Sequence, residues 1–279
     1  MIAVNVGLRR GQWLASDRDA TISHTIGAMR ARLSAVLITR NVASQLENCL
    51  SSCAFVDEIV IVDSGSTDAT LDIARRFKTK TVQQDWLGFG KQKQFAVAQA
   101  SHDWVLCVDA DERVSDTLRA NILKELEAPR FQAYEFPRRN RFLGRWLRYG
   151  EGYPDLSLRL FDRRHANWSD DPIHEKVVTA GPVGRLAGDL LHESEQGLTD
   201  YLAKQNRYTT LQAEVLHARS QRAGLAKMLL SPLLRFIKFY FFRLGFLDGI
   251  PGLMHILVGC RNSFTKYAKL RAMRRRDRR

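Results

Sequence analysis

Short apolar runs alternate with helix-like segments over residues 32–128. The runs are rich in Val, Ile and Leu and are bounded by polar residues, which is typical of buried strands. They lie at 33–38, 58–62, 80–84 and 104–109. Apolar residues recur at helical spacing after each run, ending with a predicted helix at 115–127. This alternation predicts an α/β fold with a mostly parallel sheet, helices on both faces and right-handed crossovers.

The helical rhythm stops after Pro129, and the pattern becomes mixed. An arginine-rich segment with interleaved aromatic residues occupies 138–148. The elements predicted around it are strands at 132–136, at 156–161 and from Lys176, and a helix at 198–217. We therefore expect a smaller mixed part beside the parallel sheet.

The C-terminal part has a different composition, with long apolar stretches interrupted by cations. Ser231 and Pro232 predict a helix start with proline at the first helical position. A second apolar stretch, 249–260, is too short to span a membrane, and no run of eighteen uncharged apolar residues occurs. The pattern predicts basic amphipathic helices. The expected organisation is a poorly ordered leader at 1–31, an α/β domain at 32–217 with halves at 32–128 and 129–217, and a basic helical region at 218–279.

The distribution of charge supports the division between the α/β domain and the basic C-terminal region. The net charge is +13, and residues 219–279 hold 15 Lys and Arg against 2 acidic residues. A neutral body with a basic C-terminal region predicts contact with an anionic surface, either membrane or nucleic acid. The many Phe, Leu and Tyr residues favour a membrane. The four cysteines form no zinc pattern and are expected to be reduced thiols, and no signal-peptide pattern opens the chain.

Candidate chemistry lies at the end of the fourth predicted strand, where Asp109, Asp111 and Glu112 follow an apolar run. In open α/β sheets, ligands bind at the carboxyl ends of the strands. Two carboxylates aimed at one point repel unless a cation lies between them, and Mg²⁺ or Mn²⁺ with a diphosphate suits such a pair. The alternative is a solvated turn before the next helix. No glycine-rich dinucleotide or P-loop motif follows any strand, which argues against those enzyme classes.

These residues resemble the nucleotide-sugar half of the family 2 inverting glycosyltransferases, which have the GT-A fold. Further motifs are similar to the lipopolysaccharide inner-core β-1,4-glucosyltransferase group of that family, and the resemblance covers about residues 32–270. The segments that carry it are Asn41, 62–70, 85–93, 108–113, 159–161, 174–177, 191–192 and 246–249. One departure is Val42, because many members have an acidic residue there.

The resemblance implies a donor site on the strand ends. Asp63 resembles a uracil-contacting aspartate, although it can instead form an Asx turn that starts a helix. Lys91 can lie over the nucleotide or be a surface lysine. The expected nucleotide-sugar-binding residues are Thr39, Asn41, Asp63, Ser64, Gly65, Lys91 and Asp109.

The resemblance also implies roles in metal binding, catalysis and acceptor binding. The expected ligands of Mg²⁺ or Mn²⁺ are Asp111, Asp109 and a late histidine, His192, which can instead be structural. An inverting transfer needs a carboxylate base, and we expect Glu175, with Asp171 as the alternative. The residues expected to bind the acceptor are Arg159, Arg145 and Trp146.

The expected enzyme is a metal-dependent hexosyltransferase. It would move a hexose, glucose by the resemblance, from a UDP-sugar to a lipid-linked lipopolysaccharide core oligosaccharide at the cytoplasmic face of the inner membrane. No Gln-x-x-Arg-Trp motif occurs, which argues for adding one sugar at a time. Open alternatives are another UDP-sugar transferase acting on a lipid-linked or polysaccharide acceptor, a sugar nucleotidyltransferase, and a basic membrane- or RNA-binding module. A nucleotidyltransferase would need a glycine-rich loop after the first strand, where 38–41 reads Ile-Thr-Arg-Asn. No nucleic-acid partner is expected.

Overall fold

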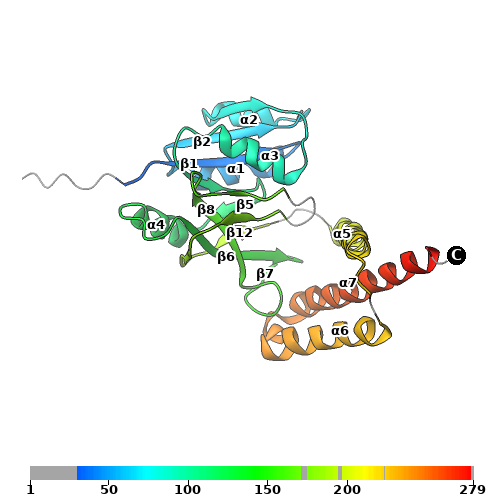
Figure 1. Ribbon diagram of the computed structural model, residues 1–279. Coiled ribbons are helices and arrows are strands. Elements are labelled where there is room, and N and C mark those ends of the chain that lie inside the picture. The colour runs from blue at the N-terminus through cyan, green and yellow to red at the C-terminus, as the bar shows by residue number, and fades with distance from the viewer. Residues whose placement is uncertain (1–29, 171–174, 194–196, 223, 278–279) are drawn as a thin grey trace, which may run out of the picture.

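The computed structural model describes residues 30–170, 175–193, 197–222 and 224–277 (Figure 1). The predicted leader at 1–31 lies outside these ranges except for its last two residues, which are anchored to the domain. Arg30 forms an ion pair with Asp57 at 2.7 Å, and the amide of Ala31 donates to the carbonyl of Leu126 at 2.8 Å.

A large sheet forms the centre of the molecule (Figure 1). Its first four strands are parallel, in the order β3 (Lys80–Gln83), β2 (Glu58–Asp63), β1 (Leu33–Thr39), β4 (Trp104–Cys107). Next to β4 the sheet continues with β8 (Asp155–Asp162), β6 (Ala133–Phe142), β12 (Leu190–His192) and β5 (Glu112–Val114). Strand β8 is antiparallel to both of its neighbours. The parallel part therefore changes at β4 into a mixed part, as the sequence predicts.

Four further short strands lie beside this sheet path, and two of them form a separate hairpin. Strands β7 (Arg145–Trp146) and β11 (Val183–Arg185) pair with β6, and β9 (Ala166–Trp168) pairs with β10 (Val177–Thr179). These additions lie around β6 and β8, the two long antiparallel strands.

Both faces of the sheet are covered. Alternate residues of β1 point to opposite sides, so Leu33 and Leu37 lie in one apolar cluster and Val36 lies in the other. The helices that pack on the first face are α1 (Ala43–Ser52), α2 (Thr70–Arg76) and α4 (Asp116–Glu125). The second face is covered by α3 (Phe89–Ala98) and by the β9–β10 hairpin. The predicted α/β class with helices on both faces is confirmed.

The mixed part differs in detail from the prediction. Strand β6 continues to Phe142 and so includes the first half of the arginine-rich segment, which has no apolar run to indicate a strand. Strand β5 is only three residues long and was not predicted. Strand β4 ends at Cys107, so Asp109 lies just beyond the strand rather than inside it.

The C-terminal part is helical. It consists of α5 (Leu198–Ala218), α6 (Leu225–Ile237), a π-helical turn at Lys238–Phe242, a 3₁₀ turn at Gly245–Asp248 and α7 (Gly249–Arg276). Helix α7 packs against both α5 and α6. The predicted helix start at Pro232 is wrong, because α6 begins at Leu225 and contains Pro232. The apolar pattern of 225–230 extends the helix toward its N-terminus, so Pro232 lies inside it, where it removes one backbone hydrogen bond and its ring crowds the preceding turn.

Within the described ranges no single helix has the length and apolar composition needed to cross a membrane. The bent pair Leu225–Phe242 and Gly245–Arg276, with an angle of 76° between its arms, passes that test as a pair.

A buried carboxylate joins the end of α4 to the start of β6. Glu125 is 9% exposed and accepts from the Arg130 guanidinium at 2.8 and 3.0 Å and from the Tyr134 hydroxyl at 2.7 Å. The hydrogen bonds from Arg130 lower the pKa of Glu125 to about 2. A carboxyl with a lowered folded-state pKa stabilises the fold above its ordinary pKa and loses this contribution as the pH falls toward 2.

The substitution Glu125→Gln should lower the free energy of unfolding at neutral pH by roughly 2 kcal/mol, because it removes a charge-assisted network. The gap between the two proteins should narrow as the pH falls below about 4.5, measured by urea unfolding at several pH values. The exposed neighbour is the control: Glu127→Gln should change stability little. A gap that stays constant down to about pH 3 would contradict the assignment.

Candidate active site

The ends of β1 and β2 are joined through one buried carboxylate. Asp63 is completely buried and accepts from the amides of Gly65 at 3.0 Å and Ser66 at 2.8 Å. Its other oxygen accepts from the hydroxyls of Thr39 and Ser66. Gly65 has a φ of 81°, which the tight turn requires. Asp63 therefore forms the Asx turn, which the sequence allows as the alternative to a contact with uracil. The contact between Asp63 and a uracil ring stays a prediction.

Asn41 joins the loops that follow β1 and β2. Its side-chain oxygen accepts from the backbone amide of Thr67 at 2.8 Å, and its backbone amide donates to the Ser66 hydroxyl at 2.8 Å. Asn41 has a φ of 52°, a left-handed conformation that asparagine tolerates. The expected nucleotide-binding residues of both loops are thus held at one edge of the sheet.

A buried glutamine on α3 connects this edge to the next loop. The Gln92 amide donates to the Ser64 hydroxyl at 3.0 Å and to the carbonyl of Gln84 at 3.3 Å, and it accepts from the amide of Leu87 at 3.1 Å. Lys91, the residue predicted to contact the nucleotide, is exposed on the first turn of α3. The role of Lys91 stays a prediction, and Gln92 beside it was not among the residues expected to bind the nucleotide.

The carboxylates beyond β4 are held by two cations from distant elements. Arg159 of β8 donates to Asp109 at 2.9 Å and to Glu112 at 3.4 Å. Lys93 of α3 lies 3.3 Å from the other Asp109 oxygen. Glu112 is completely buried and also accepts from the amide of Asp109. The network continues from Glu112 to Arg138 at 3.5 Å.

These charges set the protonation of the cluster. Burial alone would raise the pKa of Asp109, but the positive charges of Arg159 and Lys93 hold it well below its ordinary value. Burial would lower the pKa of Arg159, but the charges of Asp109 and Glu112 raise it instead. Asp109 and Arg159 are therefore both ionised at neutral pH, as a contacting acid and base.

Arg159 was predicted to bind the acceptor, and the structure places it beneath the carboxylates. It is 6% exposed and lies 5.3 Å from the Trp168 ring. Its second terminal nitrogen is buried and has no hydrogen-bond partner among the described residues. This geometry positions Asp109 and Glu112, and it leaves one donor directed into the site region.

Lys93 also reaches the predicted base. Its ammonium lies 3.3 Å from Glu175 and 4.4 Å from the centre of the Trp168 ring. The backbone of α3 approaches the strand before Glu175 closely, since a Cβ on Gly90 would lie 2.4 Å from the carbonyl of Ser169. The alternative base, Asp171, lies outside the described residues. Glu175 and Asp109 thus share one cation.

The spacing of apolar residues around Lys93 in the sequence indicates that this lysine is buried. Lys93, Val97 and Ala100 recur at the spacing of one helix face, and that face packs into the apolar cluster on the second side of the sheet. A lysine on such a face needs a buried anionic partner. Asp109 and Glu175, the partners of Lys93, lie far from it in the sequence, so the order of the residues does not indicate these ion pairs.

Asp111 and His192 form a pair beside this cluster. The ring Nε2 of His192 lies 3.2 Å from the Asp111 carboxylate, and its Nδ1 lies 2.8 Å from the side-chain oxygen of Asn140. An outer residue that orients the histidine in this way is typical of metal ligands. Among the described residues, no three His, Cys, Asp or Glu side chains gather in a form that could hold a metal ion. A cation here would take two protein ligands, with its other ligands supplied by a diphosphate and water.

Trp146 of β7 lies near two arginines that share one carboxylate partner. The guanidinium groups of Arg113 and Arg141 lie 6.0 and 5.9 Å from its ring centre, and both arginines pair with Glu193. Glu193 follows His192 directly, and its amide donates to the carbonyl of Asp111 at 3.0 Å. The predicted acceptor residue Trp146 is therefore linked to the candidate metal pair.

Arg145, the other predicted acceptor residue, is directed toward the C-terminal helices. It donates to the carbonyl of Leu247 at 3.0 Å and lies 3.6 Å from the buried Asp248. On helix α5, burial raises the pKa of Tyr208, and the negative charges of Glu175 and Asp109 add to this effect.

Comparison with known proteins identifies the family. The model of Glycosyl transferase family 2 matches residues 34–180. The lipopolysaccharide core biosynthesis glycosyltransferase LpsC of Rhizobium meliloti is 31% identical over 247 residues, which cover 85% of this chain and 91% of LpsC. An uncharacterized glycosyltransferase of Rickettsia felis is 28% identical over 257 residues, which cover 86% of this chain and 89% of that protein.

Solved structures show a weaker likeness. The crystal structure of glucosyl-3-phosphoglycerate synthase from Mycobacterium tuberculosis with Mn²⁺, UDP and glucosyl-3-phosphoglycerate is 16% identical. The match covers 70% of this chain and 82% of that chain, with a TM-score of 0.46. The family match and the sequence relatives favour a transferase over a nucleotidyltransferase or a non-enzymatic module. This chain is a glycosyltransferase that belongs to glycosyl transferase family 2.

Proposed function

We propose that this enzyme transfers a hexose from a UDP-sugar to a lipid-linked lipopolysaccharide core oligosaccharide. The observation that carries the proposal is the division of the acidic cluster: Asp109 is neutralised by protein cations, while Asp111 faces His192. A relative that shares 31% of its residues with this chain is named a lipopolysaccharide core biosynthesis glycosyltransferase. Glucose is the first hexose to test, because the motifs resemble the glucosyltransferase group.

The donor would lie along the carboxyl ends of β1, β2 and β4. The loops held by Asp63 and Asn41 form the nucleotide side of this edge. Asp109 and Lys93 lie at its centre, where a ribose or a diphosphate would meet both an acceptor oxygen and a cation. The ends of parallel strands at such a switch in strand order are the usual ligand site of open sheets.

The donor set fits a hard divalent cation. Asp111 supplies a carboxylate oxygen, and Asn140 orients the His192 ring toward it. The carboxylate suits Mg²⁺ or Mn²⁺ with open positions for phosphate, and the imidazole nitrogen favours Mn²⁺ over the harder Mg²⁺. When bound, such an ion would stabilise the negative charge that develops on the departing UDP.

Glu175 is the proposed base. Its carboxylate would accept the proton of the acceptor hydroxyl as that oxygen attacks the sugar. Lys93 holds this carboxylate at 3.3 Å and also contacts Asp109, so the base is fixed relative to the donor edge. Asp171 remains the alternative base.

The acceptor would lie against β6 and β7. Trp146 offers an aromatic face, and the neighbouring Arg113 and Arg141 would bind anionic groups of a core oligosaccharide. Arg145 lies on the side of the C-terminal helices. Helices at this end would bring the enzyme to a lipid-linked acceptor.

Contact with an anionic membrane surface would use the exposed apolar residues of the C-terminal part. Phe242 is 80% exposed and Ile250 is 73% exposed. Other large apolar residues that are at least half exposed are Leu225, Leu229, Leu230, Leu233, Leu234 and Phe241. Lys238 and Arg243 flank the turn that carries Phe241 and Phe242. Apolar residues among cations suit the headgroup region of an anionic leaflet, at the cytoplasmic side where UDP-sugars are available.

Substitution of the proposed metal ligands should abolish the metal dependence of UDP binding. In calorimetry, the wild type should bind UDP more tightly with Mn²⁺ than without it, and Asp111→Ala and His192→Ala should remove this difference. Asn140→Ala should weaken metal-dependent binding about 10- to 100-fold, because it only orients the histidine. The control is Asp116→Ala, whose side chain is 92% exposed, and it should behave as the wild type. If metal does not affect UDP binding by the wild type, the proposed metal role is wrong.

Substitution of the base should slow the chemical step without affecting donor binding. Glu175→Gln should lower kcat about 10²- to 10⁴-fold, because the acceptor proton loses its base, while UDP binding stays within the error of calorimetry. Asp171→Asn should lower kcat much less. The reverse order of the two variants would assign the base to Asp171, and two fully active variants would rule out both.

A further inference from the structure

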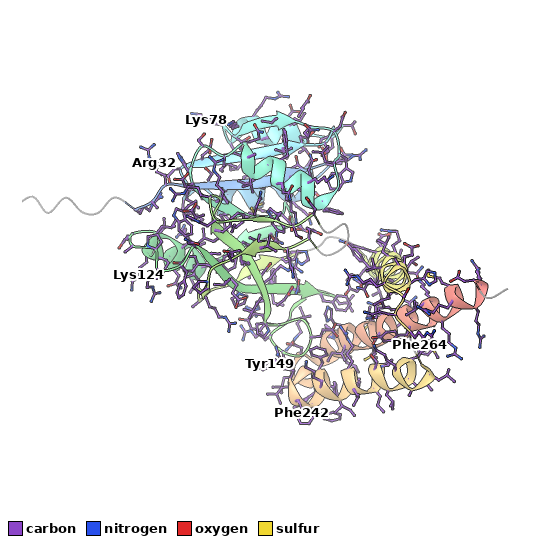
Figure 2. All side chains as sticks on the ribbon, in the orientation of Figure 1. Arg32, Lys78, Lys124, Tyr149, Phe242 and Phe264 are labelled. Carbon is purple, nitrogen blue, oxygen red and sulfur yellow. The ribbon has the colours of Figure 1, made fainter. Side chains whose placement is uncertain are left out.

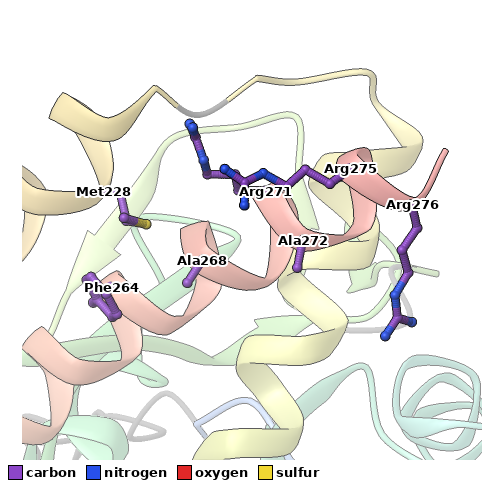
Figure 3. Close-up of a pocket in the computed structure, with 7 residues that line it drawn as sticks. All are labelled: Met228, Phe264, Ala268, Arg271, Ala272, Arg275 and Arg276. Atoms are coloured by element: carbon purple, nitrogen blue, oxygen red, sulfur yellow. The ribbon is translucent and has the colours of Figure 1, made fainter. Parts of the chain in front are cut away.

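A hollow lies between the first turns of α6 and the C-terminal half of α7, far along the chain from the donor site. Its volume is about 410 Å³, and Figure 3 shows the side chains around it. It is lined by Met228, Phe264, Ala268, Arg271, Ala272, Arg275 and Arg276. None of these residues belongs to the sheet or to the candidate active site.

One side of the hollow is apolar. Phe264, Ala268 and Ala272 recur every four residues along α7 and therefore form one stripe on that helix. Met228 of α6 lies on the opposite side of the hollow (Figure 3). Phe264 remains 41% exposed, so this apolar surface is open rather than closed by packing.

The rest of the lining is positively charged. Arg271, Arg275 and Arg276 form no ion pair and no side-chain hydrogen bond with the part of the chain that the structure describes. The nearest acid in sequence, Asp277, is paired with His217 at 3.1 Å. The helix dipole favours cations in the last turn, but Arg271 lies more than one turn before the end of α7. An external anion would therefore meet Arg271 and Arg275, which lie together without internal partners among the described residues, while the Arg276 side chain is directed away from them (Figure 3).

We propose that this hollow binds the phosphate headgroup of one anionic membrane lipid, with part of an acyl chain on Met228, Phe264 and Ala268. Guanidinium groups bind phosphate oxygens in bidentate geometry, and the apolar stripe suits a hydrocarbon chain. Neither a free phosphate nor a nucleic acid would use both surfaces. The site goes beyond general attraction to an anionic leaflet, because it assigns one lipid to defined residues.

The surroundings favour a lipid as the occupant. Helix α6, which carries Met228, also has three leucines at a spacing of four residues from its N-terminal end. Each of them is more than half exposed: Leu225, Leu229 and Leu233. The hollow thus lies at the start of the apolar stripe that we propose to contact the membrane. A lipid held there would have its chain beside an apolar surface and its phosphate among the arginines.

The test is titration of the full-length protein with a soluble short-chain phosphatidic acid. The wild type should bind it more tightly than the matching phosphatidylcholine or inorganic phosphate. The triple variant R271Q/R275Q/R276Q should bind on the order of a hundredfold more weakly, because each cation near an anionic headgroup contributes about fivefold. A matched triple variant on the other half of the molecule, R32Q/K78Q/K124Q, should bind as the wild type; Figure 2 labels these exposed residues.

A second variant separates the site from general charge. Ala268→Trp keeps every arginine but fills the hollow, and it should also weaken phosphatidic acid binding while UDP binding stays unchanged. Equal losses in the two triple variants would mean diffuse attraction and overturn the proposal. So would inorganic phosphate binding as tightly as the lipid, or a short single-stranded RNA displacing it. UDP binding is measured for every variant, so failure of the lipid site is distinguishable from failure of the proposed transferase function.

Discussion

Two carboxylates lie just beyond β4, one partly exposed and one completely buried, and the site depends on the cations that neutralise them. Asp109 and Glu112 are held by Arg159 of β8, by Lys93 of α3 and by Arg138 of β6. An uncompensated buried charge costs about 3–5 kcal/mol. The same contacts join the parallel half of the sheet to its mixed half, because Arg159 and Arg138 come from strands beyond β4 while Lys93 comes from α3, which packs on β1 and β2. The fold and the site therefore share one network.

This network divides the acidic motif into two parts. Asp109 already has two cationic partners, so a metal ion near it would compete with Arg159 and Lys93. Asp111 lies outside those contacts and faces His192, whose other ring nitrogen is held by Asn140. We infer that Asp111 and His192 receive the metal and that Asp109 positions Lys93 between the donor and Glu175. The separation follows from which carboxylate is paired with protein cations, because the two side chains are about equally exposed, at 30% for Asp109 and 28% for Asp111.

Sequence reasoning could find the strands and the positions where they end, because buried strands are apolar runs and Asp63 and Asp109 follow them directly. It could not find the partners of those carboxylates. Lys93 and Arg159 are separated from Asp109 by 16 and 50 residues, and only the sheet order brings them together. The polar half of β6 and the interior position of Pro232 were missed because local propensity does not indicate pairing or helix packing. The resemblance to family 2 glycosyltransferases predicted the family without knowledge of these contacts, and the family match confirms that prediction.

The most direct test of the division is a crystal of the full chain with UDP and Mn²⁺, with anomalous scattering used to locate the manganese. The account predicts a single peak within bonding distance of the Asp111 carboxylate and of Nε2 of His192. Asp109 should remain paired with Arg159 in the same crystal. A manganese peak coordinated by Asp109, with Arg159 displaced and His192 remote from the ion, would contradict the account.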